Sequence, residues 1–345
     1  MHRFRFVSLV GISSLLLALG SVAHADTQLT GAGSTFVFPF FSRAFFEYSK
    51  NNPGITVNYS SIGSGGGISQ FTAKTVDFGA SDVPMNTTEL AAARAANGEV
   101  VQVPVTLGAA AVAYNLPGVP NHIKLTRELL TAIFLGKVTN WSDTAFSKLN
   151  PGVNFPNMPI LVVHRADGSG TTFIFTDYLS HVSPEWKSQV GTGKVVNWPA
   201  PSAIGAKGNE GVAGQVRNSA GAIGYVELAY ALQNDISYAA LQNVAGEFVL
   251  PSIPTARAAA AQKPNVTPLD FSIVDEGGKN SYGITGYTWA FLWKNPSDRV
   301  RGKQLTDVMK WVVTSGQALA EAVKYVPLPE AVQREALKAI STIQS

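Results

Sequence analysis

The segment RADGSGT, residues 165–171, places a cation, an anion and two hydroxyl groups directly before an apolar run that begins at Phe173. The planar guanidinium of Arg165 suits two parallel hydrogen bonds to an oxyanion, and Asp167 can hold that guanidinium from its other side. Glycine lets a ligand approach the backbone, and a helix that starts here presents unpaired N–H groups. The alternative interpretation of the charged pair is a weak surface salt bridge.

Two further segments combine small residues, hydroxyl groups and a helix start. TGAGSTFVFPFF (30–41) places Ser34 and Thr35 before an amphipathic helix, and SIGSGGGISQF (61–71) places Ser64 before three glycines. Each segment alone is typical of a helix cap. Several helix N-termini that converge on one point, however, form a site for an anion.

The segment VDFGASDVPM (76–85) predicts a short strand that delivers Asp82 at its carboxyl end, where ligands of open α/β sheets bind. Otherwise, Asp82 caps a turn before Pro84. A carboxylate suits an anion site when the anion carries a proton, because Asp82 can accept that proton in a hydrogen bond. A site built around such a bond rejects an analogue that lacks the proton. Phosphate carries one near neutral pH and sulfate does not, so Asp82 argues against sulfate and molybdate.

The elements that must position these residues alternate between strands and helices, which predicts an α/β fold with parallel sheets. A helix with apolar residues at a period of 3.6 begins at Val37 and stops at NNPG (51–54), and the helix over 85–98 opens on a capping box of Asn86 and Glu89. The expected strands are 55–60, 160–163, 221–226 and 287–293, and the expected C-terminal helices are 298–314, 316–325 and 329–343.

The N-terminus has the three parts of a secretory signal peptide, namely Arg3 and Arg5, an apolar run from Phe6 to Leu19, and a small-residue cleavage site that ends at Ala25. The run is too short and too interrupted for a membrane span. We therefore expect cleavage after Ala25 and a periplasmic or extracellular protein. Removal of the two arginines lowers the formal net charge from +3 to +1. Without a basic block, the chain gives no support for binding nucleic acid.

Residues 26–345 exceed the usual size of one domain, so we expect two. The extended run 101–118 is the candidate strand that leaves one domain, and 280–293 is the candidate return. The first domain is then discontinuous, 26–106 plus 285–345, with 107–284 inserted. The chain contains no cysteine, so its stability cannot depend on disulfides and no lipid can be attached to an N-terminal cysteine.

The ordered motifs of the chain resemble the periplasmic phosphate-binding proteins of Pst-type ABC importers. The resemblance covers residues 29–235 and is weaker beyond them; it is carried by TGAGSTF, SIGSGGG, DFGASDVP, RADGSGT, WKSQVGTG, GNEGVAG and GAIGYVE. It implies a two-lobed periplasmic binding protein fold of class II, in which each lobe is a mostly parallel sheet flanked by helices, with hinge strands between the lobes. The implied function is high-affinity binding of inorganic phosphate by hinge closure and its delivery to membrane permease subunits with their ATPase. We expect a monomer without a cofactor or metal.

The resemblance also implies which residues hold the phosphate. The first lobe supplies Thr35, the backbone N–H of Phe36, Ser64 and Asp82. The inserted lobe supplies Arg165, Asp167, Ser169, the backbone N–H of Gly170 and Thr171.

Two positions depart from the family pattern. Ser34 stands where the family often has alanine, and His164 stands where it often has a basic or aromatic residue. We interpret His164 as a strand-end residue outside the ligand shell. GNEGVAG (208–214) is expected to border the cleft at a helix start, without a committed ligand.

Other functions remain as alternatives. The same scaffold can bind sulfate, molybdate or an organic phosphate, and a secreted phosphate binder can have an adhesive or signalling role. A secreted phosphatase with Ser64 or Ser169 as nucleophile is disfavoured, because a serine nucleophile needs an adjacent base or metal. The histidines form no HxxxH or HExxH pattern, and no phosphate-binding GxxxxGK[ST] loop is present. We therefore expect no enzyme activity.

Overall fold

The computed structural model describes residue 2 and residues 26–345. Apart from His2, the predicted signal peptide and its cleavage site after Ala25 lie outside the described residues. In the part of the chain that is described, no helix has the length and apolar character that a bilayer crossing requires.

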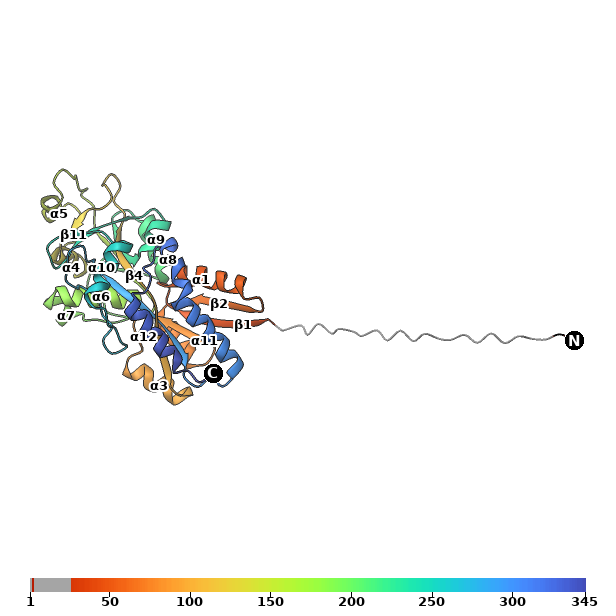
Figure 1. The fold of residues 1–345 in the computed structure, drawn as a ribbon. Helices are drawn as coiled ribbons and strands as arrows, with labels where there is room; N and C mark the ends of the chain where they lie inside the picture. The colour runs from red at the N-terminus through yellow and green to blue at the C-terminus, as the bar shows by residue number, and fades with distance from the viewer. Residues whose placement is uncertain (1, 3–25) are drawn as a thin grey trace.

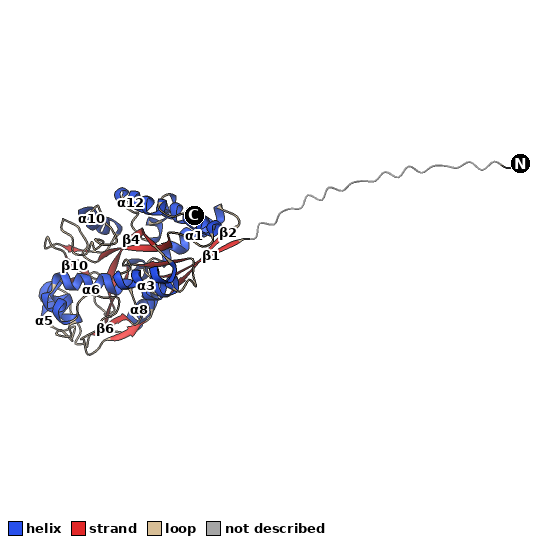
Figure 2. Cartoon of the chain, turned by 90° about the horizontal axis from the view of Figure 1, so that it is seen from below, coloured by secondary structure: helices blue, strands red, loops and turns tan. Residues whose placement is uncertain are grey.

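A mixed sheet runs through the molecule in the order β2-β1-β3-β12-β4-β8-β6-β7, and β9 also pairs with β4. Figure 2 shows β4 near the middle of the molecule, with α10 and α12 above it and α6 and α8 below it. A smaller sheet has the order β11-β10-β5. The strands are β1 (Thr27–Gly33), β2 (Ile55–Ser61), β3 (Phe78–Ser81), β4 (Val100–Tyr114), β5 (Lys124–Leu125), β6 (Leu161–Arg165), β7 (Ile204–Ala206), β8 (Ala222–Glu227), β9 (Ser237–Tyr238), β10 (Ala240–Gln242), β11 (Phe248–Val249) and β12 (Thr285–Trp293).

The long strand β4 belongs to both halves of this sheet. Its residues 100–109 pair with β12, and its residues 110–114 pair with β8. Its second half is a run of buried alanine, valine and tyrosine, which suits a strand covered on both faces. We call the half with β2, β1, β3 and β12 lobe I, and the half with β8, β6 and β7 lobe II.

The strands within each lobe are mostly parallel. In lobe I, β1 is parallel to β2 and β3, and in lobe II, β6 is parallel to β7 and β8. The strands β4 and β12 run antiparallel to their neighbours in the sheet. Strands that are parallel need crossover connections, and helices supply them here. The predicted α/β fold with two lobes is therefore confirmed.

Helices flank the sheet in both lobes. Figure 1 shows α1 and α11 on the right, in lobe I, and α4, α5 and α7 on the left, in lobe II. The helices are α1 (Phe38–Asn51), α2 (Ser64–Thr72), α3 (Thr87–Asn97), α4 (Arg127–Phe134), α5 (Thr144–Leu149), α6 (Gly170–Val182), α7 (Pro184–Gln189), α8 (Gly208–Asn218), α9 (Leu228–Gln233), α10 (Ile253–Gln262), α11 (Arg299–Val313) and α12 (Glu330–Ser341).

The predicted helix starts and stops agree with the structure except in the C-terminal region. Helix α3 carries the predicted capping box, with Asn86 and Glu89 bonded reciprocally. The prediction of one helix over 316–325 is wrong, because the segment forms two short 3-10 helices, η1 (Ser315–Leu319) and η2 (Glu321–Val323). Lys324 then adopts a left-handed φ of 71°, which ends the helical path.

A β-bulge interrupts the pairing of β12 with β4 between Thr288 and Trp289. Pro104 lies opposite Trp289. Because proline has no N–H to donate to the hydrogen bonds between the strands, it is found within sheets at bulges such as this one. Bulges redirect side chains. This one lies next to Thr288, whose hydroxyl belongs to the site described below.

Candidate functional site

Four helices begin around one buried point between the lobes. They are α1 and α2 of lobe I and α6 and α8 of lobe II. The strands β1, β3 and β6 end beside them, at Gly33, Ser81 and Arg165. Helix N-termini present N–H groups and the positive end of the helix dipole, and the carboxyl ends of parallel strands deliver side chains to the same edge. The fold therefore concentrates donors at this point.

Asp82 is the anionic centre of the site. Its side chain is 2% exposed, and one carboxylate oxygen accepts hydrogen bonds from Ser34 Oγ at 2.5 Å and from Thr288 Oγ1 at 2.7 Å. Burial raises the pKa of Asp82 to about 6, while these hydroxyls and the charge of Arg165 act against the shift. The carboxylate is therefore mostly ionised at pH 7 and available as an acceptor.

Arg165 is the buried cation opposite Asp82, and it is 5% exposed. Its Nε and Nη2 donate to the two carboxylate oxygens of Asp167 at 2.8 and 2.5 Å, so the guanidinium is clamped in one plane. Asp167 also accepts from the backbone N–H of Gly208 at 3.1 Å. Burial tends to raise the pKa of Asp167, but the bonds from Arg165 and Gly208 outweigh it and lower this pKa.

The serine hydroxyls organise the backbone donors. Ser64 Oγ accepts from the N–H of Asp82 at 3.3 Å and from that of Gly170 at 3.1 Å, so it joins lobe I to lobe II. Ser34 Oγ accepts from the N–H of Phe36 at 3.0 Å. Ser169 caps α6 by accepting from the N–H of Thr172, two residues after the helix begins. The Phe36 and Gly170 N–H groups expected to face a ligand therefore bond serine oxygens in this structure.

The two lobes meet at backbone distance beside the site. The N–H of Gly65 in α2 donates to the carbonyl oxygen of Gly168 at 2.8 Å. A Cβ on Gly65 would lie 3.2 Å from the Gly168 Cα, closer than an ordinary van der Waals contact, so the two backbones leave little room for a side chain here. An ion pair between Glu89 of α3 and Lys194 also crosses the cleft. The structure is thus a closed form of the two lobes.

The structure brings all of the expected ligand residues into one cluster between the lobes. Eight of them are buried, and Asp167 is half-buried. From lobe I come Thr35, Phe36, Ser64 and Asp82, and from lobe II come Arg165, Asp167, Ser169, Gly170 and Thr171.

Sequence reasoning missed two polar residues of this cluster. Thr288 lies 206 residues from Asp82 along the chain and reaches it from β12. Asn209 at the start of α8 is fully buried and donates to both Thr35 and Thr171. The motif GNEGVAG indicated the place of Asn209 but not its contacts, and nothing local to Thr288 distinguishes it from other strand threonines.

His164 lies at the edge of the site rather than among the proposed ligands. Its ring stacks on Trp198 with centroids 5.0 Å apart, and its Nδ1 lies 2.8 Å from the carbonyl oxygen of Arg165. Burial lowers the pKa of His164, so the imidazole is neutral at pH 7. It therefore adds no positive charge to the anion site at that pH.

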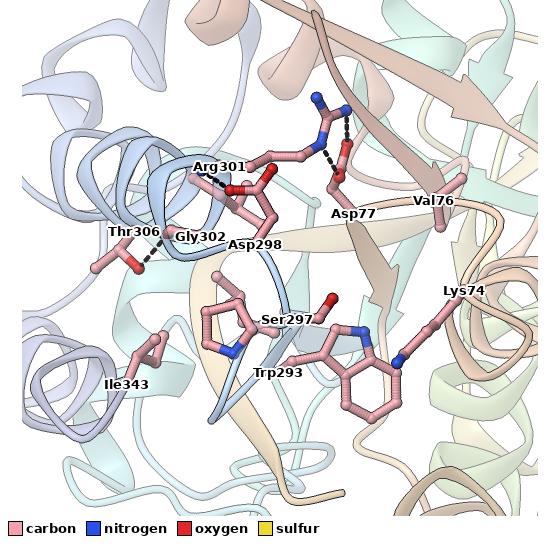
Figure 3. Close-up of a pocket in the computed structure, with 13 residues that line it drawn as sticks. Lys74, Val76, Asp77, Trp293, Ser297, Asp298, Arg301, Gly302, Thr306 and Ile343 are labelled. Atoms are coloured by element: carbon pink, nitrogen blue, oxygen red, sulfur yellow. Dashed lines mark hydrogen bonds and ion pairs between the residues drawn. The ribbon is translucent and has the colours of Figure 1, made fainter. Parts of the chain in front are cut away.

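A separate pocket of about 140 Å³ lies in lobe I, between the loop before β3 and the start of α11. Figure 3 shows the Asp77–Arg301 ion pair at its edge and Trp293 beside Lys74. Asp77 also accepts from the N–H of Thr30 at 2.6 Å, and Trp293 stacks on Phe71 at 4.2 Å. The Asp77–Arg301 pair ties α11 to the loop before β3, and the stack of Trp293 on Phe71 ties β12 to α2, so both contacts hold lobe I together.

Comparison with known proteins agrees with this fold and site. Residues 20–315 match the family model described as a PBP superfamily domain. Phosphate-binding protein PstS of Xylella fastidiosa strain Temecula1 is 44% identical over 307 residues, which cover 88% of this chain and 82% of that protein. PstS of Pasteurella multocida is 44% identical over 92% of both chains. The chain belongs to the PBP superfamily and, within it, to the family of PstS phosphate-binding proteins.

Solved structures show the same fold at greater sequence distance. A high-affinity periplasmic phosphate-binding protein, PfluDING, whose structure holds phosphate, aligns with a TM-score of 0.72 at 22% identity and covers 90% of this chain and 92% of its own. A phosphate-binding protein of Stenotrophomonas maltophilia aligns with a TM-score of 0.70 at 18% identity, over 90% of this chain and 93% of its own.

The raised pKa of Asp82 predicts a pH-dependent cost to stability. Between pH 4 and 6 the folded protein keeps the Asp82 proton while the unfolded chain releases it, so stability falls as pH rises through this window. Asp82→Asn removes this cost. In phosphate-free buffer, the free energy of unfolding of Asp82→Asn relative to wild type should therefore rise by up to about 3 kcal/mol between pH 4 and 7.

Chemical denaturation at several pH values measures this difference. Thr288→Val offers a matched test, because it removes a hydrogen bond that favours the ionised carboxylate and should move the upper end of the window to higher pH. Parallel profiles for wild type and Asp82→Asn would contradict the burial of an ionisable carboxyl at this position.

Proposed function

We propose that this protein binds inorganic phosphate between its lobes in the periplasm and delivers it to the membrane permease subunits of an ABC importer with their ATPase. The observation that carries the proposal is the juxtaposition of a clamped Arg165 and a buried Asp82 in one cluster of donors. Membership of the PstS family supports it. The mature chain begins at Asp26 after signal-peptide cleavage and acts as a monomer.

The proposed ligand contacts divide between the lobes. The free N–H edge of Arg165 grips two phosphate oxygens, and Asp167 keeps its guanidinium in plane. The hydroxyls of Thr35, Ser64, Ser169 and Thr171 donate to the anion. The N–H groups of Phe36 and Gly170 exchange their serine acceptors for phosphate oxygens, which are charged and therefore better acceptors.

Asp82 gives the site its selectivity. Its ionised carboxylate accepts the proton of hydrogen phosphate, whereas sulfate would face it without a proton and suffer charge repulsion. The same argument disfavours molybdate. An organic phosphate is disfavoured by space, since the approach of Gly65 to Gly168 closes one side of the site and eight of the nine proposed ligand residues are buried.

Hinge closure requires two bodies and flexible connections. We propose lobe I as residues 26–106 plus 285–345 and lobe II as residues 107–284, with the exchange in β4 and β12. Strand β4 passes from one half of the sheet to the other after Ala109, and β12 begins beside Ala109 at Thr285, which supports the assignment. Phosphate favours the closed form because only there can both lobes contact it.

No catalytic step is part of the proposal. Ser64 and Ser169 hydroxyls accept backbone N–H bonds, and His164 is engaged by Trp198 and a carbonyl oxygen. We therefore expect no hydrolysis of a chromogenic phosphate ester above the buffer rate at pH 5 to 9. Turnover that disappears in Ser64→Ala or Ser169→Ala would show a phosphatase instead.

Asp82→Asn should loosen the rejection of sulfate, because an amide can donate to an oxygen that carries no proton. We expect the ratio of phosphate to sulfate affinity to fall by at least about 100-fold. Titration calorimetry with both anions measures this ratio in wild type and variant. An unchanged ratio would mean that Asp82 does not discriminate between the anions.

Arg165→Ala should weaken phosphate binding by at least about 100-fold, because two charge-assisted hydrogen bonds are lost and the pairing partner of Asp167 disappears. Arg165→Lys should recover only part of the affinity, since lysine keeps the charge but not the fork. Arg217→Ala, an exposed arginine of α8, serves as the control and should bind like wild type. Equal affinity in Arg165→Ala would exclude the bidentate contact.

A further inference from the structure

We propose that Asn209 is a positioning residue that forces the hydroxyls of Thr35 and Thr171 to donate to the bound anion and, through the same bonds, latches the closed lobes. The proposal rests on the phosphate site proposed above. It assigns a role to the motif GNEGVAG, which the ligand set leaves unused.

Asn209 gives Thr35 two hydrogen bonds. Its backbone N–H and its side-chain Nδ2 both donate to Thr35 Oγ1, at 3.1 and 2.8 Å. A hydroxyl oxygen has two lone pairs and one hydrogen. Because both lone pairs are occupied, the hydroxyl hydrogen of Thr35 must point to an acceptor other than Asn209.

Thr171 is constrained in the same way. Its Oγ1 accepts from Asn209 Nδ2 at 3.1 Å and from Arg165 Nη1 at 3.3 Å. Again both lone pairs are used, and the hydrogen is free to donate. The two threonine hydroxyls come from different lobes and accept hydrogen bonds from the same amide group. This one amide therefore determines that both hydroxyls donate their hydrogens elsewhere.

The orientation of the Asn209 amide follows from its third contact. Its Oδ1 accepts from the backbone N–H of Glu227 at 2.9 Å. A flipped amide would place an NH₂ group against that N–H and an oxygen against the two hydroxyls. The side chain is fully buried, so no solvent compensates a wrong orientation. The Nδ2 group therefore faces Thr35 and Thr171.

These contacts also connect the lobes. Thr35 lies between β1 and α1 of lobe I, and Asn209 opens α8 of lobe II. Tyr230 of lobe II adds a bond from its hydroxyl to the carbonyl oxygen of Thr35 at 2.6 Å. Separation of the lobes breaks the Asn209–Thr35 bonds but leaves Asn209–Thr171 intact. Loss of the Asn209 amide should therefore speed release of the ligand more than it slows capture.

Two substitutions distinguish polarity from packing. Asn209→Asp replaces the donor by an acceptor, so both hydroxyls turn towards the carboxylate and away from phosphate. Asn209→Leu has nearly the same volume but neither donates nor accepts. We expect phosphate Kd, measured by titration calorimetry on the mature protein, to rise at least about 100-fold in Asn209→Asp and about tenfold in Asn209→Leu.

Stopped-flow binding of phosphate separates the rates. For Asn209→Leu we expect the rise in Kd to lie in a faster dissociation rate, with the association rate within about threefold of wild type. Gln215→Glu makes the amide-to-carboxylate change about two turns further along α8, where the side chain donates to Ser219 of the same lobe, and should bind phosphate like wild type.

The outcomes separate this inference from the function on which it rests. Wild type that fails to bind phosphate would overturn both. Wild type that binds, with Asn209→Asp within about threefold of it, would overturn the inference alone, as would equal losses in the Asp and Leu variants. If Asn209→Asp does not fold, judged by ligand-free thermal melting, Asn209→Leu decides: a Kd within about twofold of wild type overturns the inference.

Discussion

The structure depends on the burial of one carboxylate and one guanidinium in the same cleft. Burial of an ionised group costs desolvation free energy, and a folded protein tolerates this cost only when each buried charge has a hydrogen-bonding or charged partner. Asp82 is held by the hydroxyls of Ser34 and Thr288, and Arg165 is clamped by Asp167. These partners come from β12 and from the turns that follow β1 and β6, so the site constrains strands of both lobes. The fold thus keeps Asp82 and Arg165 buried, and each of these charges is bonded to its own partners rather than to the other.

The parallel strands explain why this frame is possible. Their carboxyl ends lie at one edge of each half-sheet, and the following helices begin there, so a single edge supplies both side chains and N–H groups. The shared strand β4 brings the two edges face to face. Strand β12 runs the other way and adds the side chain of Thr288 beside the bulge, at which Val105 of β4 is the extra residue. Most of the remaining polar contacts in the cleft follow from this arrangement.

The sequence predicted the parts of this structure that are governed by local chemistry. Glycines and hydroxyls before an apolar period mark α1, α2 and α6, and the capping box of α3 is local by nature. The prediction of a helix over 316–325 was wrong because the segment makes long-range contacts, such as the hydrogen bond from Gln317 to the carbonyl oxygen of Val105, which local propensity does not contain. The contacts of Asn209 and Thr288 were also out of reach. The Asn209–Thr35 and Thr288–Asp82 bonds join residues more than 170 positions apart, and a single sequence carries no signal for such pairs.

The contact between Gly65 and Gly168 across the cleft has a consequence for the rate at which a bound ion is released. With the backbones of Gly65 and Gly168 in hydrogen-bonding contact, this side of the cleft is closed to a bound ion. Release on this side must wait for the lobes to part, whatever the strength of the contacts to the ion. The lifetime of the complex is then a property of the hinge, and a membrane partner that holds the lobes open could empty the site without touching the ligand.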